Sequence, residues 1–369
     1  MSFTILFFAF VAIVCIQIAY YLTFLFSFSI KRAEVRLKKH IPLSVIICAK
    51  NEAENLQKNL PSILEQDYSN FEIVLVNDSS SDETLEVMKR FKELHDNIKI
   101  VDAKPIEAFW GNKKYALTLG IKASKNNFLV FTDADCRPNS NKWLQYMSSK
   151  FSNQKAIVLG YGAYAKKRFS LLNSLIRFET VVTALQYFSY ANLGLPYMGV
   201  GRNMAYRKEL FFNNSGFNGH MAIKSGDDDL FINEVADKGN TTICTSEESF
   251  TTSEPKTSFK DWILQKRRHV STSSLYKSNH QILLGLFYVS QLFFLVLGIM
   301  LLLLGHNWTW VVSLIVLRYI VLLTSFGFAA KKLNEVGLIF ITPFLELFLI
   351  STQLSIFIAN LISTPKHWK

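Results

Sequence analysis

The sequence predicts an α/β domain built on an open doubly wound sheet and inserted between apolar helices, one before it and about three after it. Two observations lead to this prediction. Short continuous apolar runs alternate with segments whose apolar residues recur at helical spacing. Four long runs are almost free of charge, and most of the remaining charge of the 369-residue chain lies between Lys31 and His280. That stretch is long enough for one α/β domain.

The first apolar run extends from Phe3 to Ile30 without a charged residue. It is longer than the ~20 residues that a membrane helix needs. Because it has no small-residue cleavage site, we expect residues 1–30 to stay in the chain as an anchor. A basic cluster, Lys31 to Lys39, follows directly. Positive flanks tend to stay in the cytoplasm, so we expect a multi-pass protein of a bacterial inner membrane whose catalytic domain, residues 31–280, is cytoplasmic.

Three further apolar runs predict a C-terminal membrane bundle over residues 281–369. They extend from Ile282 to Gly305, from Asn307 to Ala330 with Arg318 inside, and from Val336 to Pro365 with Pro343 and Glu346 inside. The last run is either a full span or a re-entrant or split segment. The number of passes and the side of the C-terminus therefore stay open.

The formal net charge is +11, and half of all residues are hydrophobic. A positive balance can indicate nucleic-acid binding. Here much of it stands beside the apolar runs, and no interleaving of aromatic and basic residues suggests base stacking. We therefore expect no nucleic acid, and instead membrane lipids and phosphate groups as partners. The four cysteines have no paired spacing, which predicts reduced cytoplasmic thiols.

The elements of the domain follow in order. The first strand is expected over Leu43 to Cys48, an unbroken apolar run typical of a strand buried on both faces of a parallel sheet. A helix with apolar residues from Leu56 to Leu64 comes next. The further strands are expected over residues 71–76, 98–101, 128–132 and 156–159, with helices through residues 85–91 and 113–122.

Two carboxylates, Asp133 and Asp135, stand at the end of the fourth expected strand. Side chains alternate along an extended backbone, so both point to one side, at the edge where open α/β sheets bind ligands. Two hard oxygen ligands that leave other positions open suit Mg²⁺ or Mn²⁺ shared with phosphate oxygens. Alone, the pattern is a weak signal, because an Asp-x-Asp loop is usually a solvated turn.

Two other positions have both a structural and a functional interpretation. Asp78 follows a buried strand, where it can be a turn residue or can accept a hydrogen bond from a nucleobase edge. Lys113 and Lys114 open a helix after Gly111, where they can form a solvated face or bind an anion. Of the two lysines, Lys113 is favoured as a diphosphate contact.

Three consecutive acids, Asp227 to Asp229, precede an expected helix. They can complement the helix dipole. Three exceed what capping needs, and their mutual repulsion would raise the pKa of at least one, as a general base requires. Further on, Gln265 and Arg268 share a helix face and could reach a diphosphate. The alternative for that helix is a basic surface lying on lipid.

Taken together, these segments resemble the membrane-embedded, inverting family 2 glycosyltransferases with a GT-A fold. The resemblance covers most of the domain, and the joint match is more specific than any single motif. The matching segments, in chain order, are Val45 to Glu52, Val76 to Asp82, Asp133 to Asp135, Gly201 to Ala205, Asp227 to Asp229 and Gln265 to His269.

The resemblance implies a nucleotide-sugar donor, UDP- or GDP-linked, and a role for each matching residue. Glu52 and Asp78 would belong to the donor site, with Asp78 on the base. Asp135, helped by Asp133, would hold the divalent cation. The acidic triplet would supply the catalytic base, for which counting back from Gly239 favours Asp228 and counting from Leu230 favours Asp227. Gln265 and Arg268 resemble the Gln-x-x-Arg-Trp motif of several membrane members.

One departure from the family pattern bears on the product. His269 stands where that motif has Trp, which argues against processive polymer synthesis. The sequence therefore predicts a transferase that moves one sugar from a nucleotide sugar to a lipid or lipid-linked acceptor at the cytoplasmic membrane face. The alternatives are a polysaccharide synthase that elongates a glycan, and a non-catalytic membrane scaffold or transporter component that retains the fold.

Overall fold

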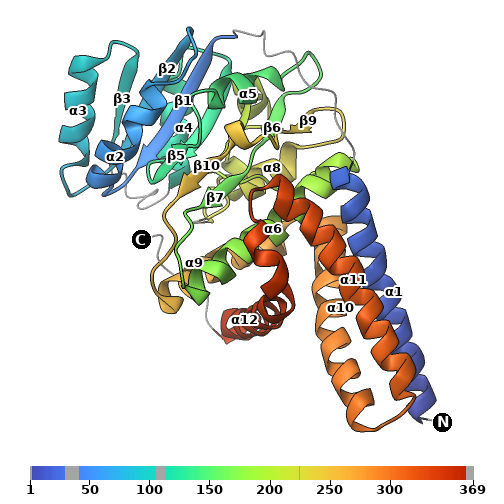
Figure 1. The fold of residues 1–369 in the computed structure, drawn as a ribbon. Coiled ribbons are helices and arrows are strands. Elements are labelled where there is room, and N and C mark those ends of the chain that lie inside the picture. The colour runs from blue at the N-terminus through green and yellow to red at the C-terminus, as the bar shows by residue number, and fades with distance from the viewer. Residues whose placement is uncertain (1, 30–40, 105–112, 224, 363–369) are drawn as a thin grey trace.

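A computed structural model describes residues 2–29, 41–104, 113–223 and 225–362. An α/β domain occupies one end of the molecule, and long apolar helices extend from it (Figure 1). The basic cluster Lys31 to Lys39, Gly111 and the C-terminal residues 363–369 lie outside the described residues, so the expectations that rest on them stay predictions.

The main sheet has seven strands in the order β3-β2-β1-β4-β8-β6-β9. The first four strands in the chain pair in parallel, as expected, but β8 is antiparallel to both β4 and β6, so the sheet is mixed. The strands are β1 Leu43–Ala49, β2 Phe71–Asp78, β3 Ile98–Ala103, β4 Phe128–Asp133, β6 Ile157–Leu159, β8 Met204–Arg207 and β9 Thr241–Ile243.

Both faces of this sheet are covered, which explains the unbroken apolar run of β1. Val45 and Ile47 pack into the core on the side of α2 Ala53–Leu64 and α3 Thr84–Leu94. Ile46 packs into the core on the opposite side, with α4 Lys113–Ala123 and α6 Leu171–Asn192. The β1 register pairs Ala49 with Asn77 and Cys48 with Asp133, so the strands end together at one edge. That edge carries the polar residues considered below.

A small second sheet, in the order β5-β10-β7, lies beside this edge. The sequence pattern did not predict it, because each of its strands has only three residues. The strands are β5 Cys136–Pro138, β7 Gly162–Tyr164 and β10 Thr251–Ser253. The remaining elements of the domain are α5 Trp143–Ser149, α7 Lys208–Asn213, η2 Asn218–His220, α8 Asp229–Val235, η3 Glu247–Ser249, α9 Phe259–Thr272 and η4 Ser273–Leu275.

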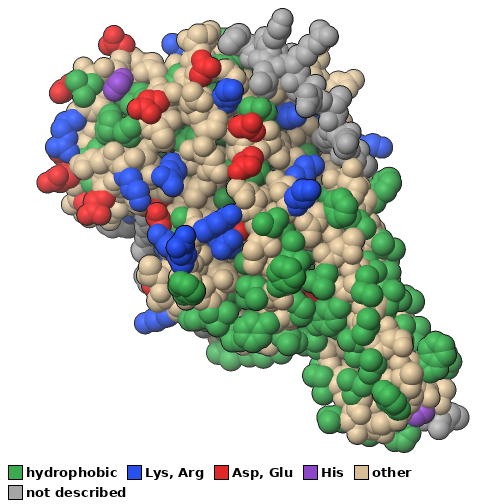
Figure 2. Space-filling model, viewed as in Figure 1, with side chains coloured by type: hydrophobic (Ala, Val, Ile, Leu, Met, Phe, Trp, Pro, Cys, Tyr) green, Lys and Arg blue, Asp and Glu red, His purple; other side chains and the backbone are tan. Residues whose placement is uncertain are grey.

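Four helical stretches in the described part of the chain are long and apolar enough to cross a membrane. Three helices lie side by side: α1 Ser2–Ser29, α10 Ser278–Leu303 and α11 Trp308–Lys332 (Figure 1). The surface of this three-helix projection is covered with apolar side chains, and the charged side chains lie on the domain and its border (Figure 2). One N-terminal and three C-terminal apolar helices agree with the sequence prediction.

The last apolar run begins with a short helix that continues directly into a longer one, so the number of passes stays open. A 3-10 helix, η5 Val336–Ile341, precedes α12 Thr342–Ile362. Pro343 stands in the first turn of α12, where a proline is tolerated because the first N–H groups of a helix have no intrahelical partner. The α12 helix leaves the three-helix group and packs mainly against α9 and α6 (Figure 1).

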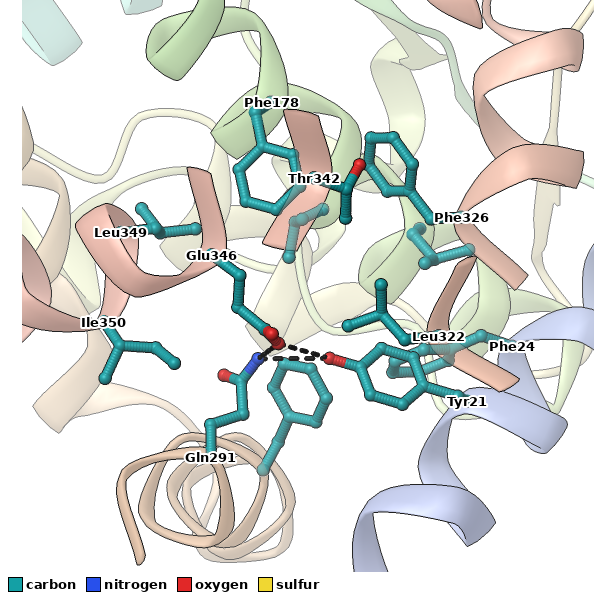
Figure 3. Close-up of a pocket in the computed structure, with 13 residues that line it drawn as sticks. Tyr21, Phe24, Phe178, Gln291, Leu322, Phe326, Thr342, Glu346, Leu349 and Ile350 are labelled. Carbon is teal, nitrogen blue, oxygen red and sulfur yellow. Dashed lines mark hydrogen bonds between the residues drawn. The ribbon is translucent and has the colours of Figure 1, made fainter. Parts of the chain in front are cut away.

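A buried polar cluster joins the apolar helices to one another. Arg318 of α11 donates to both carboxylate oxygens of Glu346 in α12, at 2.6 and 2.5 Å, and to Gln17 Oε1 of α1 at 2.8 Å. Glu346 also accepts hydrogen bonds from the Tyr21 hydroxyl and the Gln291 amide, which converge on it (Figure 3). Polar groups in apolar surroundings need such partners, so this cluster fixes how α12 meets the other helices.

Candidate active site

The acidic residues predicted from the sequence converge at the carboxyl end of the sheet. Asp133 ends β4, and the triplet immediately precedes and opens α8. Lys113, at the start of α4, lies between them, with Nζ 2.9 Å from Asp133 Oδ1 and 3.0 Å from Asp227 Oδ2. Burial by itself lowers the pKa of Lys113, but the charges of Asp133 and Asp227 raise that pKa well above its usual value. Lys113 therefore stays an ammonium that holds the two carboxylates together.

Asp133 and Asp135 fit a divalent cation. Their carboxylate oxygens and the Cys136 sulfur lie within 4.8 Å of one another. Burial and the nearby charge of Asp133 raise the pKa of Asp135, as expected for two acids that share a site. Burial also raises the pKa of the Cys136 thiol well above its usual value, so this sulfur stays protonated. The two carboxylates are thus the groups suited to a hard cation such as Mg²⁺ or Mn²⁺.

The three residues of the acidic triplet have different surroundings. Asp227 pairs with Lys113. Asp229 is saturated: its Oδ1 accepts from its neighbour's N–H, and its Oδ2 accepts from the hydroxyls of Thr272 at 2.5 Å and Tyr276 at 2.6 Å. Among the described residues, Asp228 accepts hydrogen bonds from backbone groups alone: Gly201 N at 2.7 Å and the N–H of the next residue at 2.8 Å.

Asp228 is also the acid whose titration is moved to neutral pH. Burial, followed by the charges of Asp227 and Asp229, raises the pKa of Asp228 to about 7. The hydrogen bond from Gly201 acts in the opposite direction by stabilising the carboxylate. A carboxylate with such a pKa can both hold and release a proton near neutral pH, as a general base must.

The two residues expected in the donor site beyond β1 and β2 differ in their bonding. Asp78 ends β2 and is buried, and its Oδ2 has no hydrogen-bond partner among the described residues. Burial raises the pKa of Asp78. Glu52 stands at the start of α2, where its carboxylate accepts from Asn55 Nδ2 at 2.5 Å and its N–H donates to Thr84 Oγ1 at 2.8 Å. Asp78 is therefore the better placed to receive a ligand group.

A cavity of about 640 Å³ joins these acids to the helices below the domain. Lys113, Asp133 and the triplet line one part of it, and Gln265, Arg268 and His269 of α9 line another. Asp135, Asp78 and Glu52 lie outside its lining. Helices α6, α10 and α12 supply much of the remaining wall, together with β7, residues 197–202 and η4. The structure thus brings most of the predicted site residues around one space that continues into the apolar helices.

Arg202 is a site residue whose role was not predicted. Its Nη1 donates to Ala163 O at 2.9 Å and Ser253 Oγ at 2.8 Å, and its guanidinium lies 4.1 Å from the centre of the Tyr164 ring. It lines the cavity, and its charge lowers the pKa of Asp135 against the effect of burial. The only sequence signal was its place in the Gly201 to Ala205 segment, which does not reveal these partners.

Comparison with known proteins shows which families and proteins this chain resembles. Residues 44–217 match the sequence family described as "Glycosyl transferase family 2". The chain is 31% identical over 171 residues to "Glycosyltransferase AglE" of Haloferax volcanii, an alignment that covers 46% of this chain and 51% of that relative. It is 39% identical over 93 residues to a "Poly-beta-1,6-N-acetyl-D-glucosamine synthase" of Staphylococcus epidermidis, covering 25% and 21%. The matched part thus spans 51% of the length of the first relative and 21% of the length of the second.

A solved structure shares the fold over nearly the whole chain. The mannosyltransferase PcManGT from Pyrobaculum calidifontis, in complex with GDP-Man and Mn²⁺, superposes with a TM-score of 0.62 at 15% sequence identity. The match covers 94% of this chain and 99% of that one. At this identity the likeness concerns the fold, which is therefore GT-A-like and includes the apolar helices.

Proposed function

Residues 44–217 belong to the family 2 glycosyltransferases, and from this premise we propose that the chain moves a sugar from a nucleotide-sugar donor to a lipid or lipid-linked acceptor at a membrane surface. One observation carries the proposal: a single cavity joins the acidic cluster to the space between apolar helices. A soluble acceptor would not need that continuation. A lipid-linked acceptor could reach the acids without leaving the membrane.

The donor would bind at the carboxyl edge of the sheet. Asp78 is buried, and one of its carboxylate oxygens has no partner within the described parts of the chain, which suits a hydrogen bond from a nucleobase N–H. Lys113, Gln265 and Arg268 line the cavity as candidate diphosphate contacts, and Glu52 lies at the same edge of the sheet. The neighbour PcManGT binds GDP-Man, whereas the donor base of this chain, uracil or guanine, stays open.

Asp133 and Asp135 would hold a divalent cation, Mg²⁺ or Mn²⁺. When bound, such a cation neutralises charge on the departing diphosphate. Around it, Lys113 keeps Asp133 and Asp227 in place, and Arg202 balances the charge of Asp135. These side chains orient the site before the donor arrives, which reduces the reorganisation needed during the reaction.

Asp228 would be the general base, with Asp227 as the alternative. The acceptor hydroxyl gives its proton to Asp228 while its oxygen bonds to the anomeric carbon. The bond from that carbon to the diphosphate oxygen breaks, and the nucleoside diphosphate leaves with the bonding electron pair. One displacement of this kind inverts the anomeric centre. Asp227 is less suited because Lys113 already pairs with it.

The catalytic domain would lie on the cytoplasmic side of the membrane. Lys331 and Lys332 stand in the last turn of α11, at the end of the three-helix group next to the domain (Figure 1). At the opposite end of α11, Trp308 and Trp310 are exposed, as is typical of an outer interface. Nucleotide sugars are then available directly to the domain.

Polysaccharide synthesis is the second candidate, supported by the similarity to the staphylococcal synthase over 21% of that protein's length. His269, in place of an aromatic Trp, faces the cavity and argues against processive binding of a glycan. A non-catalytic scaffold is the least supported alternative, because the carboxylates of a metal site and of a base are all present around the cavity.

The direct test is to incubate the purified protein in lipid nanodiscs with a panel of nucleotide sugars, Mg²⁺ or Mn²⁺, and extracted lipids. We expect nucleoside diphosphate release that increases with lipid and stops with chelator. Asp135→Ala should abolish it, whereas Asp96→Ala, a change at an exposed carboxylate, should not. Absence of turnover with every donor would overturn the proposed function, and full activity in excess chelator would remove the metal from it.

A further inference from the structure

The part of the cavity that faces the apolar helices is polar without being charged. The wall residues supplied by α10, between Gln281 and Gln291, and by α12, between Leu349 and Phe357, include no acid or base. Gln353 and Tyr288 are among them. An apolar helix gains nothing from a glutamine unless its amide meets a partner. This lining therefore indicates a ligand with neutral hydrogen-bonding groups.

Three glutamines in the cavity wall have side-chain amides that bond to no other described residue. Gln186 of α6, Gln265 of α9 and Gln353 of α12 are half-buried and line the cavity. Their side chains have no hydrogen-bond partner within the described parts of the chain. Each amide offers two donors and one acceptor, the complement of sugar hydroxyls, which both donate and accept. Gln265 is already proposed as a diphosphate contact, which leaves Gln186 and Gln353, on two different helices, for the acceptor.

Several basic residues of the cavity are matched by acidic or carbonyl groups of the protein. Lys266 pairs with Glu179 of α6 at 2.5 Å, and Lys113 pairs with two carboxylates. Arg202 donates to a carbonyl and a hydroxyl and stacks on Tyr164. The membrane-facing part thus has little to attract an acceptor phosphate. An ionised phosphate acceptor would also need no general base, whereas a sugar hydroxyl does.

Gly285 of α10 and Phe357 of α12 line this part of the cavity and are also exposed, so the cavity reaches the outer surface beside them. A methyl group placed on Gly285 would meet no atom within 4 Å, so the space beside it is open. Tyr288 and Phe357 border the same stretch, with ring centres 5.1 Å apart. Leu286 and Phe357 are exposed on the outer side, where hydrocarbon would surround them. The exposed residues beside this opening, Leu286 and Phe357, are apolar, whereas Gln353 in the cavity wall is polar.

We infer that the acceptor presents the hydroxyl of a neutral sugar head group to Asp228, and that its hydrocarbon tail leaves the cavity between α10 and α12, past Gly285. Gln186 and Gln353 would hold the head group. This inference rests on the proposed function and specifies its acceptor. It predicts that the tail matters for binding as well as the head group, because the two occupy different parts of one cavity.

The test uses the full chain in nanodiscs, the donor found active in the panel, and synthetic acceptors: a set of hexadecyl glycosides, their octyl counterparts and hexadecyl phosphate. We expect transfer to at least one hexadecyl glycoside and a lower kcat/KM for its octyl counterpart. Preferred transfer to hexadecyl phosphate would overturn the neutral head group. Absence of both transfer and donor hydrolysis with every donor would instead overturn the proposed function, and this inference with it.

Gly285→Leu tests the route of the tail, because a Cβ at this position meets no atom within 4 Å and the added side chain therefore starts in open space. We expect the ratio of kcat/KM for hexadecyl over octyl acceptors to fall roughly tenfold, the effect of about 1.4 kcal/mol. Gly337→Leu is the matched control, since a methyl group there also meets nothing within 4 Å and it lies outside the cavity wall. An unchanged ratio in Gly285→Leu would overturn the exit of the tail past Gly285.

Gln353→Met and Gln186→Met test the head-group contacts while keeping the length of the side chain. Each should raise the acceptor KM roughly two- to tenfold, the range expected for one lost hydrogen bond, and leave the donor KM unchanged. Leu354→Met, on the exposed side of α12, is the control. An unchanged acceptor KM in both glutamine variants would remove these amides from the site.

Discussion

The backbone N–H of Gly201 donates to Asp228 Oδ2 across 2.7 Å, and this contact orients the proposed base. Gly201 precedes β8, and Asp228 immediately precedes α8, so the bond joins the segments that lead into these two elements. The space is tight: a methyl group on Gly201 would lie 3.3 Å from the same oxygen. The carboxylate is therefore held in one position while its pKa is moved towards neutrality.

Replacing Asp228 with Asn separates catalysis from binding. Asn keeps the shape of the side chain but cannot take a proton, so transfer should fall by about 10²–10⁴-fold. Titration should show donor affinity close to that of the unchanged protein. Single-turnover transfer measured beside that titration checks both statements. If Asp228→Asn retains transfer and Asp227→Asn loses it, the base is Asp227.

The pH dependence of the reaction follows from the raised pKa of Asp228. Only the deprotonated carboxylate can act as a base, and burial together with the neighbouring acids raises its pKa to about 7. We therefore expect kcat/KM for the acceptor to be low at acidic pH, to rise through about pH 7 and to level off above it. A carboxylate with its usual pKa would give a flat profile between pH 6 and 8, and such a profile would contradict the assignment.

Lys113→Met should change the affinities for metal and donor in opposite directions. The ammonium of Lys113 pairs with Asp133, which is proposed to hold the cation, and its removal leaves more negative charge there. Mn²⁺ should then bind at least roughly tenfold more tightly without nucleotide, because unit charges 4 Å apart interact by about 4 kcal/mol at an effective dielectric constant of ~20. Affinity for nucleoside diphosphate should fall. Electron paramagnetic resonance titration of Mn²⁺ checks the first change, with Lys122→Met as the exposed control.

The sequence predicted those parts of the fold whose structure depends on one continuous stretch of chain. The strand over Leu43 to Cys48 could be identified because burial on both faces removes the usual alternation. The side chains at strand ends, such as Asp78 and Asp133, follow from the same pattern. The four apolar helices follow from length and composition alone.

Other features depend on residues far apart in the chain and gave no local signal. Lys113 and Asp227 are separated by more than one hundred residues, so their ion pair could not be read from either segment. The three strands of the small second sheet are too short for a period to be visible. Arg318 and Glu346 each interrupted an apolar run, but only the packing of α12 shows that they neutralise one another.

The Arg318–Glu346 pair gives a prediction about stability. Both side chains are almost fully buried, at 0% and 3% exposure, among apolar helices. Removing one partner leaves the other charge uncompensated, so Arg318→Met or Glu346→Gln should each lower the free energy of unfolding by about 3–5 kcal/mol. The double variant Arg318→Met with Glu346→Leu should recover much of this loss, because no buried charge remains. Thermal unfolding of the four proteins in one detergent measures the coupling.

The same cluster bears on the cavity, because Gln291 bonds to Glu346 and also lines the wall. If the ion pair sets the position of α12, acceptor KM should rise in each single variant at temperatures where the protein is still folded. Donor binding, which depends on the sheet edge, should stay constant. Equal losses in donor and acceptor binding would mean that the pair stabilises the whole chain without positioning α12.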